Sequence, residues 1–126
     1  MDWIRQAVSD FLIAIGLPAA TLDANGFLRL RTGSGGTIEL QHLSQGDAPT
    51  LMLAWSEPDP WDLARHQQSA LRLADFRQSA ATPLLVATHQ DQLVLAMRMQ
   101  ERSVSQSALE ESLDHLRLMH EQIRNS

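Results

Sequence analysis

The stretch from residue 27 to residue 40 reads FLRLRTGSGGTIEL, and it decides the fold class. On either side of residues 32–36, which are rich in glycine, apolar and polar residues alternate. This alternation is typical of β-strands with one buried face, and the short flexible connection predicts an antiparallel hairpin. A third alternating run follows a turn signal at residues 44–47. We therefore expect a meander of three antiparallel strands, over residues 27–31, 37–41 and 51–55.

Helical patterns flank the meander on both sides. Apolar residues recur every three or four positions over residues 3–15, and a glycine and a proline then end this helix. After the third strand, Asp59 is suited to cap a helix and Pro60 to occupy its first position. These two residues predict a second helix over residues 60–76.

Two further strands and a last helix complete the predicted order. The strands are expected over residues 83–88 and 93–99. Ser103 and Ser107 both offer caps for the helix after them, and Ser107 forms a capping box with Glu110. The order is therefore α-β-β-β-α-β-β-α. Helices and antiparallel strands mix without the crossovers of a parallel sheet, so we predict a single α+β domain over residues 1–126.

Composition excludes several classes of function. The chain has a formal net charge of −5, and its ten basic residues are all arginines scattered along the sequence. This is not the clustered basic surface of a nucleic-acid-binding protein. The absence of lysine rules out lysine-based phosphate binding and Schiff-base chemistry, and the absence of cysteine rules out thiolate nucleophiles and cysteine-ligated metals. We find no signal peptide or membrane span, so we expect a cytoplasmic protein.

The residue types used in catalysis are present without the spacing that catalysis needs. Ser34 lies between two glycines of the hairpin connection, whereas a nucleophile elbow requires a turn from a strand to a helix. A hydrolase that combines serine with His42, His66 and His89 is therefore disfavoured. The remaining histidines, His115 and His120, are five residues apart on a predicted helix and are interpreted as solvated. We predict no catalytic residues, no metal site and no cofactor.

The second face of the predicted sheet is not cleanly polar. Alternation places leucines on one face of each strand, but it places Phe27, Met52 and Val94 on the other face among polar residues. Either the second helix and the terminal loops cover this face, or a partner chain does. Trp3 and Trp61 each begin a helix beside its main apolar stripe. Each could close the edge of the core or anchor an interface.

Several segments resemble one family. The run FLIAIGLP at residues 11–18 and the run LDANGFLRL at residues 22–30 are similar to the opening of the CesT-type (Tir chaperone) family of type III secretion chaperones. Residues 83–85 with residues 92–99 are similar to its closing hairpin, and the terminal amphipathic helix also fits. The resemblance implies an ATP-independent homodimer that binds the N-terminal region of a secreted effector in extended form and keeps it soluble for export.

This resemblance and the positions of the residues give two sets of site residues. For binding of the effector we predict Trp3, Phe27, Met52 and Val94. For the dimer interface we predict Trp61, Leu63, Ala70 and Leu71. The alternative is a regulatory adaptor of the same fold that sequesters a transcriptional regulator or a secretion component.

Overall fold

The structure is a computed structural model that describes residues 2–18, 20–43, 49–76 and 84–125. Within these ranges it contains three α-helices, one short 3₁₀-helix at Glu101–Ser103 and a five-stranded antiparallel sheet. The element order α-β-β-β-α-β-β-α and the α+β class are thereby confirmed. The predicted turn at residues 44–47 and the first residue of the fourth predicted strand, Pro83, lie outside the described residues.

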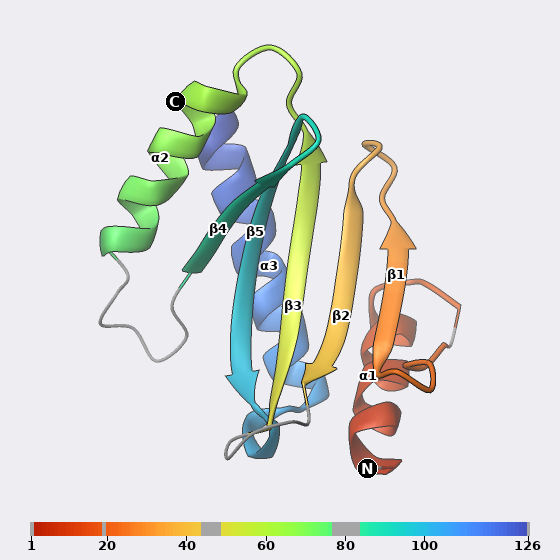
Figure 1. Cartoon of the computed structure of the whole chain (residues 1–126). Helices are drawn as coiled ribbons and strands as arrows, with labels where there is room; N and C mark the ends of the chain where they lie inside the picture. Colours follow the sequence, from red (N-terminus) through yellow and green to blue (C-terminus); the bar gives the residue numbers. More distant parts are fainter. Residues whose placement is uncertain (1, 19, 44–48, 77–83, 126) are drawn as a thin grey trace.

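The sheet has the strand order β1-β2-β3-β5-β4, so that β3 and β5 lie at its centre (Figure 1). All four strand pairs are antiparallel. Adjacent strands along the chain are neighbours in the sheet except where α2 separates β3 from β4. The strands are β1 Phe27–Arg31, β2 Thr37–Leu43, β3 Thr50–Pro58, β4 Leu84–His89 and β5 Gln92–Gln100.

One face of the sheet, here called the inner face, forms the core. Leu40 pairs with Leu53, which in turn pairs with Met97, so their side chains project from the same face of three adjacent strands. Leu40 and Leu53 are fully buried, and Met97 is nearly so. The predicted alternation is confirmed on β1, β3 and β5, because the leucines of each strand lie on this face. Burial of these side chains is the main stabilising contribution of the sheet.

The three helices pack on the inner side. In Figure 1, α1 and α3 lie behind the sheet, and α2 lies beside the β4 edge, where it also contacts α3. Each helix contributes to the core cluster through apolar residues at helical spacing. The helices are α1 Asp2–Ala14, α2 Leu63–Phe76 and α3 Gln106–Arg124. Their fully buried side chains are Ile4, Val8, Phe11, Leu12, Ala70, Leu109, Leu116 and Ile123.

Two predicted helix starts are wrong by a few residues. The second helix begins at Leu63 instead of Pro60, because the Asp59 carboxylate accepts a hydrogen bond from the Asp62 backbone at 3.3 Å and residues 60–62 form a turn. The last helix is capped by Ser105, whose hydroxyl accepts from the Ala108 backbone N–H at 3.0 Å. The capping box predicted at residue 107 therefore lies inside the helix.

Candidate functional site

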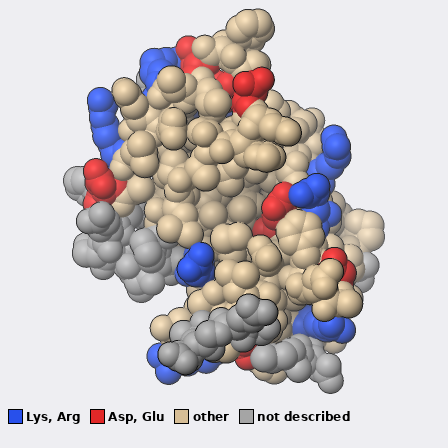
Figure 2. Space-filling view, in the orientation of Figure 1, with Lys and Arg blue, Asp and Glu red and all other residues tan. Residues whose placement is uncertain are grey.

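The opposite face of the sheet, here called the outer face, is not covered by any of the described helices (Figure 1). Its middle is apolar or small, and Figure 2 shows a broad area there without charged side chains. The strand register brings these residues side by side, with Ala54 opposite Ala96 and Ala96 opposite Leu85. We call this area the central patch, and it consists of Met52, Ala54, Ser56, Leu85, Ala87, Val94 and Ala96.

Charged residues border the central patch on two sides. On the β1 side, the Arg29 guanidinium contacts the Glu39 carboxylate at 3.1 Å and lies 5.5 Å from the centre of the Phe27 ring. Arg31 lies farther along the same edge strand, and Arg98 lies on β5 opposite Met52. Arg31 and Arg98 are exposed and have no ion pair with another described residue. The outer face is thus an apolar floor with basic borders.

Three of the four residues predicted to bind an effector lie together on the outer face. Phe27 is opposite Gln41, which is opposite Met52, and Val94 is on the neighbouring strand β5. Trp3 does not join them, because it lies on α1, which packs on the inner side. Its side chain is half exposed, at 47% of its full accessible surface. The structure therefore places three residues of the predicted set on one face of the sheet, without direct pairing between them, and the tryptophan on the other side.

The residues predicted for a dimer interface differ in accessibility. Trp61, in the turn before α2, is 91% exposed, and Leu71 is half exposed. Leu63 is partly buried against the core. Ala70 is fully buried inside the single chain, because it faces the core from the middle of α2. Its side chain is therefore not available on the surface for a second copy.

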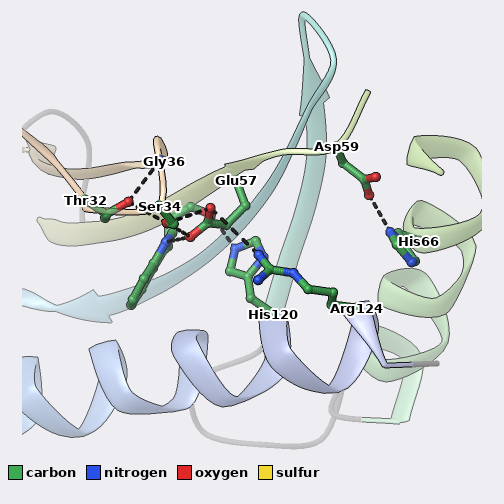
Figure 3. A network of polar contacts seen from close by, with 9 residues as sticks. Thr32, Ser34, Gly36, Glu57, Asp59, His66, His120 and Arg124 are labelled. Carbon is green, nitrogen blue, oxygen red and sulfur yellow. Dashed lines mark hydrogen bonds and ion pairs between the residues drawn. The ribbon is translucent and has the colours of Figure 1, made fainter. Parts of the chain in front are cut away.

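A polar network closes the inner face at the end where β3 leaves the sheet (Figure 3). The buried Glu57 carboxylate accepts hydrogen bonds from the Trp55 indole at 2.7 Å and from the Ser34 hydroxyl at 2.9 Å. Arg124 approaches the same carboxylate at 3.9 Å. A side chain on Gly36 would meet the Ser56 carbonyl oxygen at 2.4 Å, so only glycine fits at this point of the hairpin. The network ties the β1–β2 turn to the end of α3.

His120 belongs to the same region and is buried, contrary to the prediction of a solvated histidine. Its Nε2 donates to the Trp55 carbonyl oxygen at 2.8 Å. Burial lowers the pKa of His120 below the usual value, because the charged imidazolium loses its hydration; nearby Arg124 acts in the same direction. The hydrogen bond to Trp55 and the Glu57 charge oppose this shift. The side chain is therefore held neutral in the folded protein at neutral pH.

A second buried histidine anchors the start of α2. His66 Nδ1 donates to the Asp59 carboxylate at 2.5 Å, while its Nε2 accepts from the Arg65 guanidinium at 3.3 Å. A pocket of about 270 Å³ opens between this pair and the Glu57 network, with Trp61 at its border. Sequence reasoning missed both buried histidines. For His120 a signal exists, since it is four residues after Leu116 and therefore lies on the same helix face.

The surroundings of Ser34 and of the histidines bear on possible catalysis and metal binding. The Ser34 hydroxyl donates to the Glu57 carboxylate and not to a histidine, so it does not form the serine–histidine pair of a hydrolase. Among the described residues no group of three or more histidines and carboxylates could hold a metal ion. None of the described helices combines the length and the apolar character needed to cross a bilayer.

Comparison with known proteins identifies relatives over the full length of the chain. A family described as type III secretory system chaperone SycN matches residues 3–124. The chaperone protein SycN of Yersinia enterocolitica is 29% identical over 129 residues, which cover 98% of this chain and 98% of that protein. The family match spans all five strands, α2 and α3, and all of α1 except its first residue.

Three solved structures share the fold. The structure of the HopA1–SchA chaperone–effector complex has a TM-score of 0.68 at 14% identity and covers 98% of this chain and 91% of the other. The crystal structure of the ExsC–ExsE complex has a TM-score of 0.67 at 17% identity, with coverages of 90% and 84%. The heterodimeric ExoU–SpcU complex from the type III secretion system of Pseudomonas aeruginosa has a TM-score of 0.57 at 19% identity, with coverages of 92% and 93%.

Proposed function

The chain belongs to the SycN family of type III secretory system chaperones, and on that premise we propose that it binds the N-terminal region of a secreted effector and keeps it soluble for export. Binding needs no ATP and takes place in the bacterial cytoplasm. The observation that carries the proposal is the outer face of the sheet, where apolar side chains of central strands lie without a covering helix among the described residues. In this patch Leu85 and Ala87 are exposed and Met52 and Val94 are partly exposed. An accessible apolar patch is typical of an interaction site.

The edge strands of the sheet suggest how a long effector segment is held. β1 and β4 are edge strands, and each has one row of N–H and C=O groups without a strand partner in the described sheet. An extended segment of the effector can pair with such an edge, while its side chains enter neighbouring apolar sites. Phe27 lies on β1, and Met52 and Val94 lie inward from it on the outer face. We assign these three residues to the effector site.

We further propose that the chaperone acts as a homodimer. Two large apolar side chains are exposed in this region: Trp61 in the turn before α2 and Leu71 on α2 itself. Burial of a tryptophan that is 91% exposed would remove a large apolar area from water and so stabilise an interface. Two copies would present two equivalent binding faces to one effector chain. Because the second contact is then intramolecular, the dimer holds a long segment more tightly than one copy does.

Co-expression with the products of neighbouring open reading frames tests this function. A tag on each candidate effector should retain the chaperone, and size-exclusion chromatography with light scattering should give a complex of fixed stoichiometry. Met52→Asp combined with Val94→Asp should weaken binding at least about tenfold, because two charges would enter an apolar contact. Leu118→Asp is the matched control, since Leu118 is 48% exposed on α3, and it should retain binding.

The same experiment identifies the outcomes that contradict the proposal. A chaperone that stays monomeric and binds none of the co-expressed products would exclude the proposed function. Retention of a folded regulator in place of an export substrate would instead support the regulatory adaptor. Denaturant unfolding of each variant checks that a loss of binding does not arise from a loss of folding.

A further inference from the structure

The outer face differs in charge from the protein as a whole. Its charged residues are Arg29, Arg31, Glu39 and Arg98, which gives three positive charges and one negative charge, a net charge of +2. The complete chain has a net charge of −5. Glu39 is paired with Arg29, so the face offers no free carboxylate of its own to Arg31 and Arg98. An acidic protein therefore presents its apolar patch inside a basic border.

The middle of this face is suited to a helix and not to an extended chain. The backbone groups of β3 and β5 are paired with strands on both sides, so a strand placed on top of them would find no hydrogen-bond partners. An α-helix satisfies its own backbone groups. The small residues Ala54, Ser56 and Ala96 are themselves buried, and the side chains that the patch offers to a partner are those of Met52, Val94, Leu85 and Ala87. Three adjacent strands span roughly 10 Å, about the diameter of a helix.

From these observations we propose that the outer face binds an amphipathic α-helix whose apolar stripe is flanked by aspartate or glutamate. The inference rests on the proposed function and adds to it the chemistry of the bound segment. The apolar stripe packs on the central patch, and the acidic flanks lie near Arg31 and Arg98. The effector would then have two bound segments: a helix on the outer face and an extended segment paired with an edge strand of the sheet.

Charge argues against a second copy of this chain as the occupant. If two outer faces met, a net charge of +2 would lie against an equal charge, with Arg31 and Arg98 of each copy in the interface. The second helix offers no compensation, because α2 contains two arginines and one aspartate. The occupant that complements the face is a partner segment with acidic flanks.

Two synthetic peptides provide the test. Both are about 18 residues long and have the same leucine stripe, and they differ only in flanking residues, which are glutamate in one and lysine in the other. Fluorescence anisotropy should show that the glutamate peptide binds at least about tenfold more tightly, with an affinity that falls as salt is added. Arg31→Glu combined with Arg98→Glu should remove or invert this preference.

A matched variant separates local from general electrostatic effects. Arg5→Glu with Arg72→Glu changes the net charge by the same amount, but these exposed arginines lie on α1 and α2. This control should keep the preference for the glutamate peptide. Equal affinity for both peptides, binding of neither, or an equal loss in the control would overturn the inference. So would a dimer that dissociates only when Arg31 and Arg98 are reversed.

Retention of an effector by the wild-type chain and by the Arg31 and Arg98 double variant tests the proposed function separately from the charge inference. If an effector is retained by the wild-type chain and by the Arg31 and Arg98 double variant alike, the charge inference is wrong and the chaperone function stands. If no effector is retained by the wild-type chain, the proposed function itself fails.

Discussion

The inner and outer faces of one sheet are built from alternate residues of the same strands, yet they differ in almost every physical respect. On β3, Leu53 points inward and is fully buried, whereas its neighbour Met52 points outward and is only partly buried. The inner face is covered by three helices and ends in a network of buried hydrogen bonds. The outer face has no described helix over it and carries exposed arginines.

This difference separates the requirements of folding from those of function. The inner face explains why the chain folds, because burial of its leucines and methionines supplies the driving force. The apolar residues of the outer face are not needed for that purpose, since a solvated antiparallel sheet is usually polar on its free side. Their presence at the centre of the sheet therefore indicates a contact with another molecule.

Truncation of neighbouring residues on the two faces should give the largest contrast. Leu53→Ala should lower the free energy of unfolding by about 2–5 kcal/mol, because it leaves a cavity in a tightly packed core. Met52→Ala should change it by about 0.5 kcal/mol in the free protein, because its side chain is already partly solvated. Urea unfolding at several protein concentrations measures both. Equal losses would mean that the outer face is already covered in the free protein.

Two carboxylates, Glu57 in the buried network and Glu39 on the outer face, should differ by an intermediate amount in their contribution to the free energy of unfolding. Glu57→Gln should destabilise the fold by about 1–3 kcal/mol, because the amide keeps one acceptor oxygen but loses the negative charge that strengthens the hydrogen bonds from Trp55 and Ser34 and attracts Arg124. Glu39→Gln breaks an ion pair in which the arginine is largely exposed, and it should cost at most about 1 kcal/mol. Guanidinium unfolding is unsuitable because its salt screens the charges, so urea is the denaturant. A larger loss for Glu39 would contradict the contrast.

Alternation in the sequence was sufficient to predict the two faces. The period of two in β1, β3 and β5 assigned each side chain to one side of the sheet, and the register places the leucines of these strands on the inner face. Burial follows the period less strictly, because the small outer-face residues Ala54, Ser56 and Ala96 are buried as well. Helix starts were less accurate, because local signals compete. Ser103 and Ser107 are the predicted caps, but Ser105 between them is the cap in the structure, where the buried residues Val104 and Leu109 on either side of it favour this start. That tertiary constraint is not visible in the local sequence.

The polar network shows the limit of reasoning from a single sequence. Glu57 and His120 are more than sixty residues apart, and only the packing of α3 against the end of β3 brings them together. The burial of Ala70 inside the single chain was not predicted for a related reason, because a small residue on a helix has no preferred side until the helix is placed. The exposed arginines of the outer face, in contrast, follow directly from the register of their strands.

The smallest expected effect concerns the pH dependence of stability at the closed end of the inner face. The pKa of His120 is lower in the folded protein than in the unfolded chain, where it has an ordinary value near about 6.5. As the pH falls below that value, the unfolded chain binds a proton that the folded protein does not bind. Stability is therefore lost as the pH decreases from about 6.5 toward the folded-state pKa, by at most about 1.4 kcal/mol per pH unit from this residue.

His120→Gln isolates this contribution, because glutamine can still donate to the Trp55 carbonyl but does not titrate. Urea unfolding at about pH 7.5 and about pH 5.5 should show a smaller loss of stability on acidification in this variant than in the wild type. His115→Gln is the matched control on the exposed face of α3, and it should keep the wild-type dependence. If both variants behave alike, the burial of His120 does not govern acid sensitivity, and the inner face is more open at this end than the network in Figure 3 implies.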